Sequence, residues 1–274
     1  AGAAALLFLG CRARGLRLGF PLRNHFWFML LGLLLFGVNY ILAYRAQIYI
    51  SSALTAIAFS TLVWMNIINA RLLFGVRARP RVVVGALLGV AGIVTLFAPE
   101  IGAISFTDDV FFGSALVLLS ALVASFGNMV SQKAQKEALP VVQSNAWGML
   151  YGAVLTGVIA AVQGHEFVFD WSPGYVISLA YLILFGSVIA FGAYLTLLGR
   201  IGAHKAGYAM VMFPVVALVL SVLFEGLTID AATITGVALV LAGNVFVLGF
   251  GSWPRRAAAP PAGRFGARRI RGAR

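Results

Sequence analysis

The longest uncharged stretch of the chain runs from Trp171 to Gly199 and decides the fold class: WSPGYVISLAYLILFGSVIAFGAYLTLLG. An α-helix rises about 1.5 Å per residue and needs about 20 apolar residues to cross the hydrocarbon core of a bilayer. This stretch is long enough, and it lacks the alternating pattern of a membrane barrel strand. Because backbone groups in lipid must satisfy their own hydrogen bonds, we expect a transmembrane helix here.

The rest of the chain has the same character. Its 274 residues are 61% apolar and only 10% charged, and the mean hydropathy is +0.98. A soluble domain would carry about a quarter charged residues and could not hide this much apolar surface from water. We therefore expect an all-α, polytopic integral membrane protein. The eight stretches long enough to span are Phe26 to Tyr44, Ala46 to Ala70, Val82 to Pro99, Val110 to Gln132, Ala138 to Gly164, Trp171 to Gly199, Ala206 to Phe224 and Ala231 to Pro254. A further apolar piece, Ala1 to Cys11, is too short to cross and is expected to be the end of a partial helix.

The charged residues alternate in sign from one connection to the next. Basic connections lie around Arg12 to Arg23, Arg77 to Arg81, Lys133 with Lys136, Arg200 with Lys205, and Arg255 to Arg274. The connections between them are acidic or uncharged: Gln47 to Ser52, Glu100 to Asp109, Glu166 to Asp170, and Glu225 to Asp230. The positive-inside bias then predicts cytoplasmic basic loops and a cytoplasmic C-terminus.

The net charge of +12 is concentrated in those connections and in the tail. Residues 252–274, rich in Arg, Ala, Pro and Gly, are expected to form a basic disordered tail near anionic headgroups. Binding of nucleic acid by Arg264 to Arg274 is the alternative that this composition leaves open, and we do not expect it. The Arg- and Ala-rich usage suggests a bacterial source and therefore an inner membrane.

A repeated pattern relates the two halves of the chain. The stretch Gly85-Ala86-Leu87-Leu88-Gly89-Val90-Ala91-Gly92 recurs as Gly236-Val237-Ala238-Leu239-Val240-Leu241-Ala242-Gly243, about 150 positions later. If the repeating unit has five helices, an odd number, the second copy enters the membrane from the opposite side. Inverted repeats of this kind are typical of transporters, which hold their substrate near the midplane between the repeats. Chance similarity of two small-residue helices is the alternative.

The chain resembles the drug/metabolite transporter superfamily, and within it the EamA-type family. The resemblance rests on the two small-residue helices, on Arg200-Ile201-Gly202-Ala203-His204-Lys205-Ala206 leading to Phe213-Pro214-Val215-Val216-Ala217, and on Phe224-Glu225-Gly226-Leu227-Thr228. The first half departs from the family at Phe74-Gly75-Val76-Arg77, where the family usually places a glutamate after the glycine.

The resemblance implies ten helices in two inverted five-helix repeats, with both chain ends in the cytoplasm. The sequence would then hold a partial second helix and eight complete ones, the third to the tenth. Residues 1–100 would form the first repeat, shortened at its N-terminus, residues 110–251 the second repeat, and residues 252–274 the tail.

Residues that could carry catalysis or bind a metal are few. The chain has one cysteine, Cys11, and three histidines, all at span ends and not at ligand spacing. All eight acidic residues fall in loops or at membrane edges, so a carboxylate for proton coupling is either not used or lies on the first helix of the repeat. We therefore expect a protein that is not an enzyme, with no cofactor and no metal.

Polar and aromatic residues inside spans are the better site candidates. An amide in hydrocarbon costs several kcal/mol unless it finds a partner, so each should face another helix or a wet cavity. The resemblance implies a cavity lined by the third, fourth, sixth, eighth and ninth helices. Asn66 and Asn69 are further polar residues of the spans, and Pro214, deep in a span, is a candidate hinge. The expected substrate-binding residues are Asn39, Tyr40, Trp64, Asn128, Tyr194 and Tyr208.

These features together predict a secondary transporter of small metabolites. The expected solutes are amino-acid-like or drug-like, exported by alternating access of the two halves. A passive channel and a non-transport membrane scaffold are the alternatives. The expected partners are a small-molecule solute, the lipid bilayer and, as an open alternative, a second copy in a homodimer.

Overall fold

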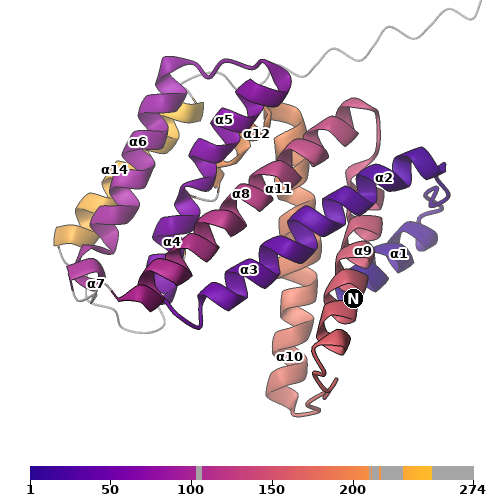
Figure 1. The fold of residues 1–274 in the computed structure, drawn as a ribbon. Coiled ribbons are helices and arrows are strands. Elements are labelled where there is room, and N and C mark those ends of the chain that lie inside the picture. Colours follow the sequence, from indigo (N-terminus) through magenta and orange to yellow (C-terminus); the bar gives the residue numbers. More distant parts are fainter. Residues whose placement is uncertain (103–106, 210, 212–215, 217–230, 249–274) are drawn as a thin grey trace, which may run out of the picture.

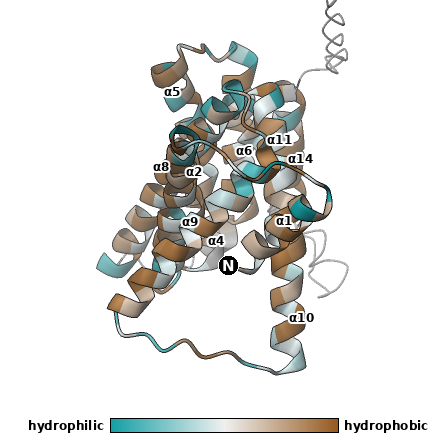
Figure 2. Ribbon diagram, turned by 90° about the vertical axis from the view of Figure 1, so that its right-hand side faces the viewer, coloured by the Kyte–Doolittle hydropathy of each residue, from teal (hydrophilic) through white to brown (hydrophobic). Residues whose placement is uncertain are grey.

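The computed structural model describes residues 1–102, 107–209, 211, 216 and 231–248, and every regular element in these residues is a helix. Figure 1 shows them as a bundle, and Figure 2 shows hydrophobic residues along the helices with hydrophilic ones gathered at helix ends and connections. An all-helical chain with this surface is what a bilayer requires, because helices satisfy their backbone hydrogen bonds internally. The protein is therefore a multi-pass membrane protein.

The first half of the chain forms helices α1 to α7. The expected span Phe26 to Tyr44 lies inside one continuous helix, in which a π-helical segment, η1, separates α2 from α3. α6 begins with Pro80 at its first turn, where the missing N–H of proline has no helical partner to lose. The elements are α1 (Gly2–Ala13), α2 (Leu22–Leu31), η1 (Gly32–Val38), α3 (Asn39–Ala46), α4 (Ser52–Ser60), α5 (Leu62–Phe74), α6 (Pro80–Leu96) and α7 (Ala98–Gly102).

The second span begins later than the sequence indicated. We expected it to start at Ala46, but α3 ends there and the chain turns before α4 begins at Ser52. The hydroxyl of Ser51 accepts a hydrogen bond from the Leu54 N–H at 3.3 Å and caps the new helix. The turn confirms the uncharged connection expected at Gln47 to Ser52, and it shows that the start of the span at Ala46 was wrong because an uncharged turn has the hydropathy of a span. At the C-terminal end of this span, α5 ends at Gly75. Gly75 has φ +68°, a left-handed backbone conformation that favours glycine.

The second half contains the longest helices. α8 begins after Thr107, whose hydroxyl accepts from the Val110 N–H, and carries acidic residues in its first turn and basic ones in its last, as the helix dipole favours. A second π-helical segment, η2, interrupts the helix that follows α9. The elements are α8 (Asp108–Lys136), α9 (Val141–Val162), α10 (Pro173–Tyr181), η2 (Leu182–Ile189), α11 (Ala190–Ile201), α12 (Ala203–Ala206) and α14 (Ala231–Leu248).

Five helices in the described part of the chain are long and apolar enough to cross a membrane: Leu22–Ala46, Leu54–Phe74, Asp108–Lys136, Val141–Val162 and Pro173–Ile201. Three more are apolar but shorter: Gly2–Ala13, Pro80–Leu96 and Ala231–Val247. Most of the expected span Ala206 to Phe224 lies outside the described residues, as does the whole tail 252–274. The expected count of eight complete spans therefore stays a prediction.

Helices α6 and α14 lie side by side and antiparallel, with glycines facing across the contact. A Cβ placed on Gly85 would lie 2.6 Å from the carbonyl oxygen of Gly243, and one on Gly92 would lie 2.7 Å from the carbonyl oxygen of Gly236. Only residues without a side chain allow two helix backbones to approach this closely. We call this contact the glycine seam.

The helical limb formed by α10 and η2 is packed very differently. None of the residues from Pro173 to Ile189 is buried, and in Figure 1 α10 projects from the lower end of the bundle. Its exposed side chains are mostly large and apolar, including Tyr181, Leu182 and Phe185. Such a surface is compatible with lipid rather than water.

Candidate solute-binding pocket

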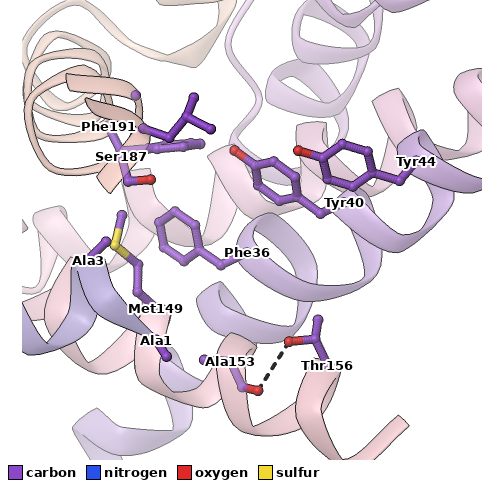
Figure 3. Close-up of a pocket in the computed structure, with 12 residues that line it drawn as sticks. Ala1, Ala3, Phe36, Tyr40, Tyr44, Met149, Ala153, Thr156, Ser187 and Phe191 are labelled. Carbon is purple, nitrogen blue, oxygen red and sulfur yellow. Dashed lines mark hydrogen bonds between the residues drawn. The ribbon is translucent and has the colours of Figure 1, made fainter. Parts of the chain in front are cut away.

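A pocket of about 270 Å³ lies between the two helices that contain π-helical segments. One wall comes from η1 and α3, the opposite wall from η2 and α11, and α9 and the first residues of the chain complete it (Figure 3). The lining residues are Ala1, Ala3, Phe36, Tyr40, Tyr44, Met149, Ala153, Thr156, Leu182, Gly186, Ser187 and Phe191.

Aromatic rings form much of the pocket wall. Phe36 and Phe191 pack edge to face, with ring centroids 5.0 Å apart. Tyr40 and Tyr44 are stacked, with centroids 6.0 Å apart and an interplanar angle of 29°. Figure 3 shows the two tyrosine hydroxyls side by side and directed the same way. Aromatic pairs in these geometries give a rigid apolar surface with a polar edge.

The hydroxyl groups of the pocket divide into two kinds. Thr156 donates to the carbonyl oxygens of Gly152 at 3.0 Å and Ala153 at 3.1 Å, the second drawn dashed in Figure 3. The hydroxyls of Tyr40, Tyr44 and Ser187 have no hydrogen-bond partner among the described residues. These three groups can each donate to a solute or accept from it.

No charged side chain is among the twelve lining residues. The pocket therefore offers aromatic faces and neutral hydroxyls, which suit a solute with an apolar body and polar groups of no net charge. A pocket with a few convergent polar groups in an otherwise apolar wall is the usual form of a small-molecule site.

A second polar feature lies in the core and consists of Asn66 on α5, Asn128 on α8 and Tyr194 on α11. We call these three residues the polar triad. Asn66 and Asn128 are 0% and 1% exposed and Tyr194 is 7% exposed. Asn128 Nδ2 donates to Asn66 Oδ1 at 3.3 Å. On its other side the triad meets Gly207, where an added Cβ would lie 2.5 Å from Asn66 Nδ2.

Asn66 Nδ2, Asn128 Oδ1 and the Tyr194 hydroxyl meet strict hydrogen-bond geometry with no partner among the described residues, but the Tyr194 hydroxyl lies close enough to the side chains of Asn66 and Asn128 to hydrogen bond with both. Nearby amides differ in this respect. Asn69, one turn along α5, donates to Ser125 Oγ at 2.9 Å, and Gln132 accepts from the Ala203 N–H at 3.1 Å. Those two residues join helices by single direct hydrogen bonds, whereas the triad joins α5, α8 and α11 through contacts among its own three side chains.

The six residues expected to bind substrate lie in separate places. Tyr40 lines the pocket, and Asn128 and Tyr194 belong to the polar triad. Asn39 is turned to α8, where its Oδ1 accepts from Ser120 Oγ at 2.8 Å, a contact that joins two helices.

Two of the expected residues and the expected hinge lie elsewhere. Trp64 and Tyr208 pack around the glycine seam with Val63 and Val240. The Tyr208 hydroxyl donates to the Gly85 carbonyl oxygen at 2.6 Å. Pro214 lies outside the described residues.

Eleven of the twelve lining residues were not among the six expected, and they include Phe36, Tyr44, Ser187 and Phe191. A signal for two of them was present in the sequence. Phe36 and Tyr44 are four positions before and after Tyr40, so the three side chains share one helix face. Phe191 and Ser187 come from a helix about 150 positions away, and only the tertiary structure brings them to the same pocket.

Comparison with known proteins identifies the family. Residues 111–249 match the EamA-like transporter family, which is about half of the chain. The chain is 29% identical over 232 residues to YedA of Escherichia coli (strain K12), named an inner membrane transporter, covering 84% of this chain and 72% of that protein. It is 26% identical over 189 residues to the transporter YoaV of Bacillus subtilis (strain 168), covering 68% of this chain and 63% of that one.

The fold is also found among solved structures. One crystal structure superimposes with a TM-score of 0.75 at 20% identity, covering 89% of this chain and 83% of the other. The family resemblance expected from the sequence is therefore confirmed, and it carries the conclusion that this is a membrane transport protein for small solutes and not an enzyme. The chain belongs to the EamA-like transporter family.

Proposed function

We propose that the protein is a secondary transporter that exports amino-acid-like or drug-like solutes, and that the pocket between η1 and η2 binds them. The observation that carries this proposal is the uncharged wall of aromatic rings and unpaired hydroxyls at Tyr40, Tyr44 and Ser187. Such a wall suits solutes with apolar bodies and no net charge.

The proposed mechanism is alternating access between two inverted repeats. The glycine seam supports the repeats, because Gly85 faces Gly243 while Gly92 faces Gly236. If Gly85 corresponds to Gly236 and Gly92 to Gly243, a two-fold axis between the helices exchanges these two contacts. The same offset relates the π-helical segments η1, Gly32–Val38, and η2, Leu182–Ile189.

The hinges of this mechanism are placed at the two π-helical segments. A π-helical segment interrupts the regular i to i−4 hydrogen-bonding of a helix, and such segments occur frequently at functional sites. η1 is held against α9, where a Cβ on Gly32 would meet the Gly148 carbonyl oxygen, whereas η2 has no buried residue. The α10 limb is therefore the part that moves across the pocket. Pro214, the hinge expected from the sequence, stays a second candidate.

The proposed orientation places the basic connections in the cytoplasm. In Figure 1 the α5–α6, α8–α9 and α11–α12 connections lie toward the upper end, and the α3–α4 and α9–α10 connections lie toward the lower end. The connections at the upper end contain the basic residues within 77–81, 133–136 and 200–205. The connections at the lower end are uncharged or acidic. By the positive-inside bias the upper end is cytoplasmic, and the pocket belongs to the outer half of the membrane.

The test is solute counterflow in proteoliposomes with labelled amino acids, sugars and cationic drugs. Saturable exchange of one solute class is expected. A passive channel would instead give flux that does not saturate, and a scaffold would give none in correctly folded protein.

A pair of glycine variants tests the pocket itself. Gly186→Leu places a side chain in the pocket, where an added Cβ meets only Leu182, at 3.5 Å. We expect it to reduce exchange at least about tenfold by filling the site. Gly192→Leu, on the α11 part of the same continuous helix, is the matched control, because nothing lies within 4 Å of a Cβ there. Equal exchange by the two variants would reject the pocket as the solute site.

A further inference from the structure

The connection between α1 and α2 carries four arginines within twelve positions and no acidic residue. They are Arg12, Arg14, Arg17 and Arg23, and all four are exposed. We call them the arginine set. The first acidic residue of the whole sequence is Glu100, so the first 99 residues supply no carboxylate side chain to these arginines.

The neighbouring connection does not neutralise the arginine set either. The α1–α2 connection lies beside the α8–α9 connection, because Phe20 packs against a buried cluster that contains Leu139. The acidic residue of that connection, Glu137, pairs with Lys133 at 3.4 Å, and this is the only ion pair among the described residues. The charges of the arginine set therefore have no acidic partner in the described part of the chain.

The backbone of the α1–α2 connection is held in place although its arginines are exposed. The Trp147 indole N–H, on α9, donates to the Leu18 carbonyl oxygen at 3.1 Å. The Leu16 N–H donates to the Cys11 carbonyl oxygen at 2.9 Å, which ties the connection to the end of α1. The arginines are thus presented from a fixed position at the end of the bundle.

Two members of the arginine set favour an anion from outside the chain. Arg23 lies in the first turn of α2, where a positive charge opposes the helix dipole. Arg17 Nε donates to the Gly19 carbonyl oxygen at 2.7 Å, and the terminal NH₂ groups of Arg17 have no hydrogen-bond partner among the described residues. Guanidinium NH₂ groups match the oxygens of a phosphate group in geometry and charge.

Exposed apolar side chains between the arginines indicate what kind of anion fits. Leu16 and Leu22 alternate with members of the arginine set and are 39% and 87% exposed, and Phe26, one turn later, is 53% exposed. A soluble phosphate ester or a nucleic acid would complement the arginines and leave these apolar side chains in water. A phospholipid complements both, because its phosphate lies at the headgroup level directly above its acyl chains.

We propose that the arginine set binds the headgroup of an anionic phospholipid, with the acyl chains of that lipid against Leu16 and Leu22. This site goes beyond the proposed function, since no solute takes part in it. It also gives the lipid a place in the structure, because the lipid would hold the end of α1, whose first residues complete the pocket.

The test measures which lipid stays bound to the protein. The full chain is released from nanodiscs that contain equal amounts of phosphatidylglycerol and phosphatidylcholine, and native mass spectrometry gives the ratio of the two bound lipids. We expect a ratio of at least about ten in favour of phosphatidylglycerol, because choline adds a positive charge that the arginines repel. Glycerol 3-phosphate in solution should not displace the lipid, since it has no acyl chains.

A charge-removing variant locates the lipid. Arg12→Gln, Arg14→Gln and Arg23→Gln in one chain remove three exposed charges that have no ion-pair partner in the described structure. We expect the ratio of phosphatidylglycerol to phosphatidylcholine to fall at least about fivefold. Thermal unfolding checks that this variant is folded.

The matched control removes three positive charges at other places. It combines Arg45→Gln, Lys133→Gln and Lys136→Gln. Arg45 lies in the last turn of α3, at the opposite end of that membrane span from α2. Lys133 already pairs with Glu137, and Lys136 Nζ lies over the Phe74 ring at 4.4 Å from its centroid. The lipid ratio of this control should stay within about twofold of the wild-type ratio.

Each outcome decides the question. Equal retention of both lipids by the wild-type chain, an unchanged ratio in the folded arginine variant, or an equal fall in the two variants would overturn the proposal. Displacement by glycerol 3-phosphate would assign the arginines to a soluble phosphate ester and would also overturn it. If the triple arginine variant does not fold, Arg14→Gln alone replaces it, with an expected fall of about twofold against no change for Lys136→Gln. Solute counterflow is measured separately, so failure of the proposed function leaves this result unaffected.

Discussion

The glycine seam and the α10 limb are both made of apolar helix, yet they are packed in opposite ways. At the seam, α6 and α14 touch backbone to backbone, and Ala86, Ile93 and Val240 beside the contact are fully buried. Along α10 and η2 no residue is buried. The small residues of the seam allow close approach, whereas the large side chains of the limb keep neighbouring helices at a distance.

This difference supports the division of moving and fixed parts in the proposed mechanism. Separating α6 from α14 would lose a continuous set of close contacts, so the seam is expected to stay closed through the transport cycle. The α10 limb has few contacts to lose, and a π-helical segment connects it to α11. In the proposed mechanism, residue size on otherwise similar helices therefore decides which of them moves.

The largest expected effect comes from breaking the seam. Gly92→Leu would place a Cβ 2.7 Å from the Gly236 carbonyl oxygen, which belongs to a helix backbone and cannot turn aside. Overpacking of this kind costs about 3 kcal/mol or more, so thermal unfolding followed by intrinsic fluorescence should show a much lower midpoint. Gly157→Leu is the control, because nothing lies within 4 Å of a Cβ there. Equal midpoints would contradict a tight seam.

Removing one hydroxyl from the pocket should have the next largest effect. Tyr40→Phe keeps the aromatic wall but deletes a hydroxyl that has no protein partner in the described structure and is free for a solute. The loss of one hydrogen bond should raise KM for counterflow about fivefold, with no change in thermal stability. Tyr181→Phe, on the exposed limb, is the matched control and should leave KM unchanged. A stability loss without a KM change would remove Tyr40 from the site.

The same substitution at the seam should give the opposite pattern. Tyr208→Phe deletes the hydrogen bond to the Gly85 carbonyl oxygen and should lower the free energy of unfolding by about 1 kcal/mol. KM should not change, because Tyr208 lies in the seam cluster and does not line the pocket. Denaturant unfolding and counterflow on one preparation measure both quantities. A raised KM for Tyr208→Phe at unchanged stability would show instead that Tyr208 binds solute.

The smallest expected effect is at the start of the α10 limb. Asp170 accepts hydrogen bonds from the Ser172 backbone N–H and hydroxyl, both at 2.8 Å, and these bonds lower the pKa of the Asp170 carboxyl. Because the folded-state pKa is depressed, the stabilisation is present above the unfolded-state pKa, about 3.9, and is lost as pH falls through the folded-state pKa.

The measurement for this prediction is protease cleavage of the 163–172 connection at neutral pH. Asp170→Asn should make cleavage slightly faster, because an amide NH₂ replaces one of the two carboxylate oxygens that accept from Ser172, the residue before α10. Glu166→Gln changes a charge in the same connection and should have no effect. Equal cleavage of the wild-type and Asp170→Asn chains would show that this bond does not order the connection.

The sequence determined the membrane environment, the helical class and the family. These follow from the length of uncharged runs such as Trp171 to Gly199. In lipid, runs of this length and pattern can satisfy their backbone hydrogen bonds only as helices. The alternation of charge also placed a connection at Gln47 to Ser52, where the structure has its turn, although the run of uncharged residues put the start of the next span too early, at Ala46. These patterns could not show the π-helical segments, which change hydrogen-bonding without changing composition.

The candidate site residues were also predicted from the sequence only in part. Depth in a span is readable from sequence, so Asn39, Asn128 and Tyr194 could be recognised as buried polar residues. Which neighbour each one meets is not readable: Asn39 meets Ser120, whereas Asn128 meets Asn66 and Tyr194. The sequence alone determined that polar groups would be buried in lipid, because their positions within the spans are fixed by the chain. Only the tertiary structure decided which partner each of them meets, because hydrogen bonding between helices depends on how the helices face one another.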